Sequence, residues 1–397
     1  MDSGSIAWLL TASALVLLMT PGLAFFYGGL VRSQNVLSTI MLSFMSMAVV
    51  SVVWVLWGYS VAFGEGNAWV GDLSYLGLSG IEPGEDMLFA IFQMMFAIIT
   101  PALITGAIVE RFKFTTYLVF LVAWVTLVYA PICHWVWAGN GWLFELGALD
   151  FAGGTVVHIN AAVAAVAAAI LVGKRRNPGL EPGNVPYVVI GAALLWFGWF
   201  GFNAGSGLAA DGVAINAFLV TNTAAAAAAL TWGLLSQFQH NRMSAAGVAT
   251  GAVGGLVAIT PAAGAVGVMG ALGIGVGAGL LCYFAVLLRP RLGVDDSLDV
   301  FAVHGIGGIW GAIATGIFTV EAFAGVKGVI EGDFAQLGIQ LTGVGATLVY
   351  SFIASLIILK ILDLIPGLGL RVSEKEEAQG LDVSSHGERA YVHDGAD

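Results

Sequence analysis

The chain has 397 residues, of which 58% are hydrophobic and only 10% are charged, and its formal net charge is −11. A water-soluble protein of this length could not bury so much apolar surface, which excludes a soluble globular protein and indicates an integral membrane protein. We therefore expect a lipid bilayer around most of the chain, and no nucleic acid as a partner.

Eleven apolar stretches follow one another along the chain. Each is a candidate membrane-spanning helix, because about 20 residues cross a hydrocarbon core of about 30 Å. In chain order they cover residues 6–29, 36–63, 86–109, 115–138, 153–173, 185–206, 215–236, 245–259, 264–288, 299–318 and 334–364. The first begins without basic residues and is too long for the apolar part of a signal peptide, so we expect it to be retained. The eighth is short and rich in glycine.

The charges of the connecting loops predict the orientation. An odd number of spans places the termini on opposite faces, and thirteen of the fourteen Lys and Arg residues then share the face of the C-terminus. Basic residues favour the cytoplasmic side, which predicts an external N-terminus and an internal C-terminus. The external face carries twelve acidic residues and Lys327, so the whole formal charge of −11 lies there. Such a face either concentrates cations at a pore mouth or is an ordinary set of solvated acidic loops.

Two histidines, His158 and His304, lie within the fifth and tenth spans. An ionisable side chain at membrane depth is costly and usually lines the path of an ion or a proton. The first five spans and the next five run in opposite directions, and each half closes on a span that opens with Asp and carries His further in. The pairs are Asp150 with His158 and Asp299 with His304. We therefore predict an all-α membrane protein with a five-plus-five inverted repeat and both histidines near the bilayer midplane.

The same side chains allow other roles. A metal centre would need a third ligand at similar depth, which no Cys, Glu or Asp supplies, whereas a haem held between two histidines would need no further ligand. Asp150 would either cap the fifth span or stabilise a nearby cation, and these roles are compatible. Phe96 and Trp137 would either pack in the core or form a cation–π cup for an unhydrated monovalent cation. Cys133 and Cys282 are expected to be small buried hydrophobic residues.

Six segments resemble the signature sequences of the Amt/Mep/Rh ammonium transporter family. They are PGLAFFYGG (21–29), DFAGGTVVHINAA (150–162), WFGFNAGS (199–206), DVFAVHG (299–305), GLRVSE (369–374) and GLDVSSHGE (380–388). The resemblance extends over essentially the whole chain, and the last two segments are similar to the tail of the bacterial and archaeal Amt branch.

The resemblance implies a homotrimer of eleven-helix protomers, each with its own pore, in the cell inner (plasma) membrane. It implies a transporter rather than an enzyme, with no cofactor. It assigns the external ammonium site to Phe92, Phe96, Trp137 and Ser206, the gate to Phe96 and Phe202, the pore to His158 and His304, and an electrostatic or structural role to Asp150. Residues 1–366 would form the membrane transport domain, and residues 367–397 a cytoplasmic regulatory tail near which a PII-class signal protein binds.

The implied function is recruitment of ammonium at the aromatic site, deprotonation, and conduction of ammonia through a hydrophobic pore. A narrow apolar path opposes an intact cation, because burying an unpaired charge costs many kcal/mol. The imidazoles can instead exchange hydrogen bonds with neutral ammonia. Whether the proton follows through the histidines is open, so transport is either electrogenic or neutral. Two other functions also remain open: an ammonium-sensing receptor with little flux, and a membrane oxidoreductase with a bis-histidine haem.

Overall fold

The computed structural model describes residues 1–178 and 181–391, and all regular secondary structure in these ranges is helical. The first half contains α1 (Ser3–Leu30), α2 (Val36–Val53), α3 (Tyr59–Phe63), α4 (Glu85–Ile104), α5 (Phe114–Trp124), α6 (Ala130–Trp137), α7 (Trp142–Glu145) and α8 (Asn160–Val172). The second half contains α9 (Val185–Trp199), α10 (Gly212–His240), α11 (Ala245–Ile259), α12 (Val268–Leu288), α13 (Ile306–Phe318), α14 (Glu321–Ala324) and α15 (Ala335–Leu364). Two short helices, α16 (Glu374–Gln379) and α17 (Leu381–His386), follow them.

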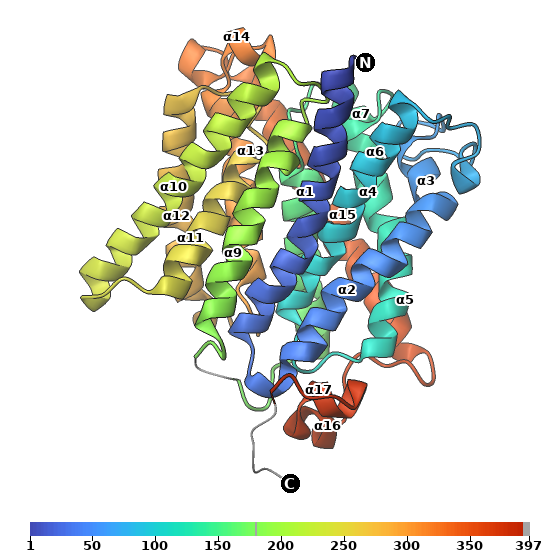
Figure 1. Cartoon of the computed structure of the whole chain (residues 1–397), viewed down its shortest axis with the longest axis vertical. Helices are drawn as coiled ribbons and strands as arrows, with labels where there is room; N and C mark the ends of the chain where they lie inside the picture. The colour runs from blue at the N-terminus through green and yellow to red at the C-terminus, as the bar shows by residue number, and fades with distance from the viewer. Residues whose placement is uncertain (179–180, 392–397) are drawn as a thin grey trace.

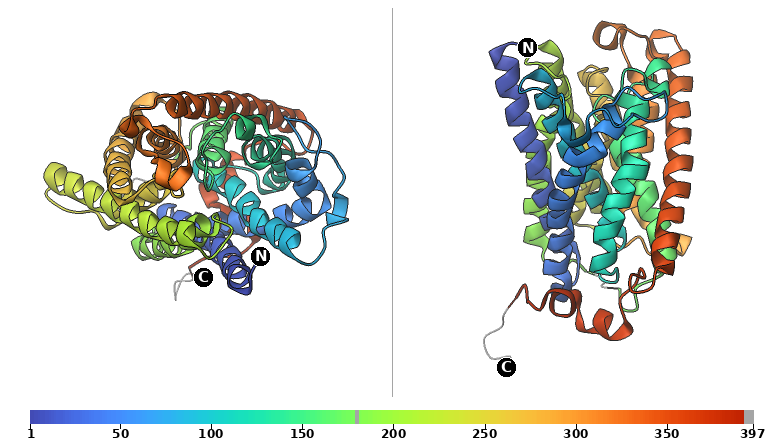
Figure 2. Two further views of the ribbon diagram at one scale, coloured as in Figure 1. Left: turned by 90° about the horizontal axis from the view of Figure 1, so that it is seen from above. Right: turned by 90° about the vertical axis from the view of Figure 1, so that its right-hand side faces the viewer.

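The long helices stand side by side in one bundle. The N-terminus of α1 lies at one end of the bundle, whereas α16 and α17 lie at the other (Figures 1 and 2). Ten helical segments of the described chain are long and apolar enough to cross a membrane, and α11 is a shorter apolar helix of 15 residues. The chain is therefore a multi-pass membrane protein.

The helix ends lie within a few residues of those expected from hydropathy, with one informative difference. The ninth span begins at Val268 rather than at position 264. The intervening residues form tight turns after α11, in which Ala262 N–H donates to the Ile259 carbonyl (2.9 Å) and Ala265 N–H to the Ala262 carbonyl (2.8 Å). Apolar composition alone does not distinguish such a buried turn from the first turn of a helix.

Close approach of helix backbones accounts for several of the 55 glycines of the chain. Gly255 of α11 and Gly275 of α12 both face Ala224 of α10, and a Cβ atom on them would lie 2.5 and 2.4 Å from the Ala224 carbonyl oxygen. A Cβ on Gly191 of α9 would lie 2.2 Å from the backbone nitrogen of Phe26 in α1. Any larger residue would push these helices apart, and small residues let membrane helices gain close van der Waals packing.

Five π-helical turns interrupt the helices of the described chain. They are η2 (Trp54–Gly58), η5 (Val125–Tyr129), η6 (Gly154–Ile159), η7 (Phe200–Ala204) and η9 (Phe301–Gly305). Such turns are rare and often occur at functional sites. Three of them carry residues singled out from the sequence: His158 in η6, Phe202 in η7 and His304 in η9.

The C-terminal segment, which comprises the described residues after α15 (365–391), docks onto the end of the bundle opposite the N-terminus. The backbone N–H of Val372 donates to the carbonyl of Arg111 (3.0 Å), which holds the start of the segment against the loop after α4. Further along, the carboxylate of Asp382 accepts a hydrogen bond from the backbone N–H of Ser38 (2.8 Å). Asp382 thus caps the first turn of α2 across the fold, where the unpaired N–H groups favour an anion.

A buried carboxylate, Glu377 of α16, fixes the middle of this segment. It is 3% exposed, accepts hydrogen bonds from the Arg371 guanidinium (2.7–3.1 Å), and accepts one from the backbone N–H of Arg176 (2.8 Å). Arg371 also donates to the carbonyl of Val172, the last residue of α8 (3.1 Å). The docked segment is therefore bonded directly to the end of a helix that begins beside His158.

Candidate functional site

The two histidines meet inside the bundle. His158 is 1% exposed and His304 is 4% exposed, and their Nδ1 atoms lie 3.3 Å apart. The ring centroids are 5.4 Å apart at an interplanar angle of 26°. When both rings are neutral, one Nδ1 donates and the other accepts. The Nε2 atom of His158 has no hydrogen-bond partner among the described residues.

Aromatic rings continue from His158 toward the end of the bundle that holds the N-terminus. Phe202 stacks on His158 with centroids 5.9 Å apart, and Phe96 lies 4.3 Å from Phe202. Beyond Phe96, Trp137 meets it edge-on at 5.7 Å and Phe92 at 4.9 Å. The histidines and aromatic residues predicted from the sequence therefore form one column, which we call the aromatic column: His304, His158, Phe202, Phe96, Phe92 and Trp137.

The outer end of the aromatic column carries the polar groups. The Trp137 indole N–H donates to the Asp150 carbonyl (2.8 Å), which fixes the ring. The Ser206 hydroxyl donates to the Phe202 carbonyl (2.8 Å), and the neighbouring Gly205 packs directly against the Phe92 ring. Trp137 also borders a pocket of about 610 Å³ whose wall includes two carboxylates, Glu65 and Asp86.

The carboxylate of Asp150 caps the helix that carries His158. Its Oδ1 accepts hydrogen bonds from the backbone N–H groups of Gly153 (3.0 Å) and Gly154, and its Oδ2 from those of Thr155 (2.8 Å) and Val156 (3.1 Å) and from the Thr155 hydroxyl. Both oxygens are therefore engaged in capping, and Asp150 is 7% exposed. This geometry shows that Asp150 caps the helix. An additional electrostatic role would require a bound cation close to the Asp150 carboxylate.

The matching cap in the second half is Asp296, and the prediction that Asp299 is the aspartate of the second pair, with His304, was wrong. The Asp296 carboxylate accepts from the backbone N–H groups of Val300 (3.0 Å) and Phe301 (2.7 Å), at the start of η9. Asp299 instead adopts a left-handed backbone conformation (φ 60°) and pairs with Arg289 (2.8 Å). Asp150 precedes His158 by eight residues, and Asp296 precedes His304 by the same eight.

A buried arginine ties the two histidine-bearing helices together at their far end. The Arg111 guanidinium is 0% exposed and donates to the carbonyl of Gly173 (2.8 Å), directly after α8. It also donates to the Ser297 hydroxyl (2.7 Å) and the Asp295 carbonyl (2.7 Å), directly before η9. Burial alone would raise the pKa of the Asp295 carboxyl. The hydrogen bonds and positive charge of Arg175 outweigh this effect and lower the pKa from its usual value to about 2. At this end of the site, the charged side chains of Arg111, Arg175 and Asp295 therefore lie together.

Sequence reasoning missed Trp199 as a direct neighbour of His158. Its ring stacks on His158 with centroids 5.4 Å apart and an interplanar angle of 20°. The indole N–H donates to the Thr260 hydroxyl (2.9 Å), which holds the ring in place. Trp199 opens the segment WFGFNAGS, so the signal was present, three residues before Phe202.

The geometry disfavours the haem alternative. A metal held between the two Nδ1 atoms would separate them by about 4 Å, because each metal–nitrogen bond is about 2 Å. The observed Nδ1 separation is 3.3 Å, and Trp199 and Phe202 occupy the stacking positions around His158. Among the described residues, no group of three or more His, Cys, Asp or Glu could hold a metal ion.

Comparisons with known proteins agree with the resemblance. The model of the Ammonium Transporter Family matches residues 7–391. The ammonium transporter Amt1 of Archaeoglobus fulgidus is 48% identical over 396 residues, which cover 99% of this chain and 100% of the relative. The crystal structure of Saccharomyces cerevisiae Mep2 superposes with a TM-score of 0.92 at 38% identity, covering 100% of this chain and 93% of that chain. A structure described as a sensor Amt protein superposes with a TM-score of 0.89 at 32% identity, covering 96% of this chain and 98% of that chain.

Proposed function

Because this chain belongs to the ammonium transporter family, it carries ammonium across a membrane, and we propose that it does so along the aromatic column from Trp137 to His304. The observation that carries the proposal is the contact between two buried imidazoles at the inner end of a continuous stack of rings. Recruitment, gating and conduction then belong to successive parts of the column.

The outer end recruits the cation. The faces of Phe92, Phe96 and Trp137 attract a monovalent cation without a buried counter-charge. Because the Ser206 hydroxyl donates its proton to the Phe202 carbonyl, its oxygen lone pairs remain to accept a hydrogen bond from ammonium. Ammonium differs from potassium in donating hydrogen bonds and in being able to lose a proton, so this acceptor contributes to selectivity.

Phe96 and Phe202 form the gate beneath the recruitment site. Both side chains are 0% exposed, and their ring centroids are only 4.3 Å apart. Passage requires the rings to move, and the apolar surroundings penalise an intact cation far more than neutral ammonia. Ammonium therefore loses its proton at or before this gate.

His158 and His304 form the conducting path below the gate. Their shared hydrogen bond occupies both Nδ1 atoms, while Nε2 of His158 has no partner among the described residues and is available to ammonia. Imidazoles can also relay a proton. If the proton follows ammonia through the pair, transport carries charge; if it returns outward, the protein conducts neutral ammonia.

We further infer eleven membrane-spanning helices, with α11 as the eighth, in a five-plus-five inverted repeat with the N-terminus outside and the C-terminus inside. The equal separation of cap and histidine, Asp150 to His158 and Asp296 to His304, supports the repeat. The concentration of basic residues on one side supports the orientation. The expected location is the cell inner (plasma) membrane.

The assembly proposed is a homotrimer in which residues 1–366 form the transport domain of each protomer. Residues 367–397 would form a cytoplasmic regulatory tail, near which a PII-class signal protein binds. The docked contacts of Glu377 and Asp382 support a regulatory role, because they place an outward-facing helix pair on the side opposite the recruitment site. The trimer itself rests on membership of the family.

A second candidate, an ammonium sensor with little flux, is favoured by the likeness to the sensor Amt protein. Current recordings on proteoliposomes with ammonium and potassium pulses, together with an internal pH dye, separate the possibilities. An ammonium current that potassium does not elicit would indicate charge-carrying transport, and internal alkalinisation without current would indicate neutral ammonia conduction. Ammonium binding with neither signal would favour the sensor, and equal potassium currents would contradict the proposed path.

A further inference from the structure

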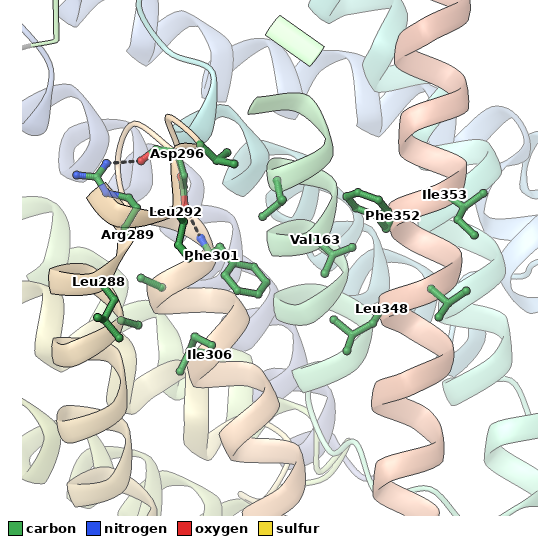
Figure 3. A pocket seen from close by; sticks show the side chains of 15 residues that line it. Val163, Leu288, Arg289, Leu292, Asp296, Phe301, Ile306, Leu348, Phe352 and Ile353 are labelled. Atoms are coloured by element: carbon green, nitrogen blue, oxygen red, sulfur yellow. Dashed lines mark hydrogen bonds between the residues drawn. The ribbon is translucent and has the colours of Figure 1, made fainter. Parts of the chain in front are cut away.

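A groove of about 670 Å³ opens on the side of the bundle between α12, α13 and α15, with α8 behind it. Figure 3 shows its side chains pointing into a common space from these separate helices. The groove lies outside the aromatic column and takes no part in the proposed ammonium path. It reaches the outer surface beside η9, the turn that carries His304.

The walls of the groove are hydrocarbon. They include Val163 of α8, Leu288 of α12, Ile306 of α13, and Phe352 and Ile353 of α15. The outer wall faces away from the protein, since Leu288 is 50% exposed and Ile353 is 51% exposed. All four helices belong to membrane-spanning segments, so the groove opens onto the bilayer rather than onto water.

One end of the groove carries charged side chains, with Asp296 beside Arg289 in the lining, and the Asp296 carboxylate is already held by the backbone N–H groups of η9. Arg289 lies at the rim, pairs with Asp299 and donates to the Asp296 carbonyl, and its side chain remains 27% exposed. Arg291 follows two residues later in η8 (Arg289–Leu292) and is exposed. Both lie on the side that the charge distribution assigns to the cytoplasm. Basic groups beside a crevice between membrane helices on that side attract anionic lipid headgroups.

We propose that this groove binds one acyl chain of an anionic phospholipid of the cytoplasmic leaflet, with its phosphate beside Arg289 and Arg291. The chain would also lie against Phe301 and Ala302, which belong to η9 and precede His304 by three and two residues. The lipid thus supports the outer side of the π-helical turn whose other side presents His304 to His158. Bound lipid therefore stabilises the π-helical turn that holds His304 in the proposed ammonium path.

Lipid titration of the delipidated oligomer, followed by native mass spectrometry, tests the proposal with phosphatidylglycerol and phosphatidylcholine of matched chains. Ala285→Trp fills the groove from α12 and Ile353→Trp fills it from α15, so the test survives if one variant fails to fold. Matched controls on the same helices are Leu281→Trp and Ile357→Trp, which are exposed residues outside the groove. Arg291→Gln removes an exposed positive charge two residues beyond Arg289, and Arg242→Gln, which replaces an exposed arginine elsewhere, is its control.

We expect the tightest phosphatidylglycerol site to weaken at least tenfold in both groove-filling variants and to be unchanged in their controls. Arg291→Gln should reduce the preference for phosphatidylglycerol over phosphatidylcholine several-fold, whereas Arg242→Gln should not. A phosphatidylglycerol with a photoactivatable acyl chain should label peptides containing Phe352. Equal effects of groove and control variants, labelling elsewhere, or loss of the oligomer in the groove variants would each overturn the proposal, the last because it would indicate a second protein copy as occupant.

Discussion

At the scale of single residues, the proposed path predicts that the contact between His158 and His304 determines which species can pass. Replacement of either ring by an acid, His158→Asp or His304→Glu, places a fixed negative charge in an apolar path and offers a bare cation a counter-charge. We expect these variants to admit potassium or to lose discrimination between ammonium and potassium. Current recordings with both cations measure the change. Wild-type flux and wild-type discrimination in both variants would refute the twin-histidine path.

The five hydrogen bonds that Asp150 accepts allow its capping role to be tested by substitution. Asn and Asp rank alike as helix caps in general, but here both carboxylate oxygens accept hydrogen bonds, and an amide retains only one acceptor. We expect Asp150→Asn to lower the free energy of unfolding by about 1–3 kcal/mol. Thermal unfolding of the purified protein measures this loss.

Asp296 supplies the control that separates capping from charge, because it caps η9 in the same manner. If Asp150 acts only as a cap, Asp150→Asn and Asp296→Asn should reduce flux in proportion to their loss of stability. If the Asp150 charge also stabilises ammonium or the departing proton, Asp150→Asn should abolish transport while the protein remains folded. Near-normal flux in Asp150→Asn would dismiss the electrostatic role.

At the scale of elements, hydropathy predicted where the helices lie but not the π-helical turns within them or the residues that cap them. The span of α11 was predicted at its observed bounds, because a run of small apolar residues ends at a proline. The π-helical turns η6, η7 and η9 were not predictable, because one extra residue per turn leaves the apolar composition unchanged. Likewise, Asp295, Asp296 and Asp299 all precede η9, and only the folded geometry shows that Asp296 is the cap.

The short helix α16 depends on one buried acid, which gives a direct test of its docking. Glu377→Gln leaves the Arg371 guanidinium without its charged partner, and because Arg371 is 29% exposed we expect a loss below the about 3–5 kcal/mol of a fully buried pair. Glu374→Gln is the matched control in the same helix, because its pair with Arg176 is exposed and such pairs contribute about 0–1 kcal/mol. We expect faster tryptic cleavage at Lys375 in Glu377→Gln alone. Equal cleavage in the two variants would contradict a docking role for the buried pair.

At the scale of the whole molecule, the two ends of the bundle differ in structure. The column begins at Trp137 on the side of the N-terminus, and the docked tail covers part of the opposite side (Figure 1). Composition predicted the separation between the apolar bundle and the polar tail, because residues after position 364 turn charged. The contacts that bind the two together were not predictable, since they join side chains of the tail to backbone groups more than 190 positions away.

Those long-range contacts lead to a prediction for the tail as a unit. Truncation after Leu370 removes Arg371, which donates to the end of α8, and Asp382, which caps α2. The membrane-spanning helices keep their mutual packing, so we expect the oligomer to form. Transport should change, because α8 is the continuation of the turn that holds His158, and PII-class binding should be lost.

Size-exclusion chromatography with light scattering, a flux assay and a pull-down with the PII-class protein measure these three outcomes on one preparation. Truncation after Tyr391 is the control, because it shortens the chain while retaining the contacts of Arg371, Glu377 and Asp382. It should transport and bind as the full chain does. If truncation after Leu370 changes neither flux nor binding, the docked segment contributes only to stability. A tail that influences transport through its contact with α8 cannot be removed without changing the ammonium flux.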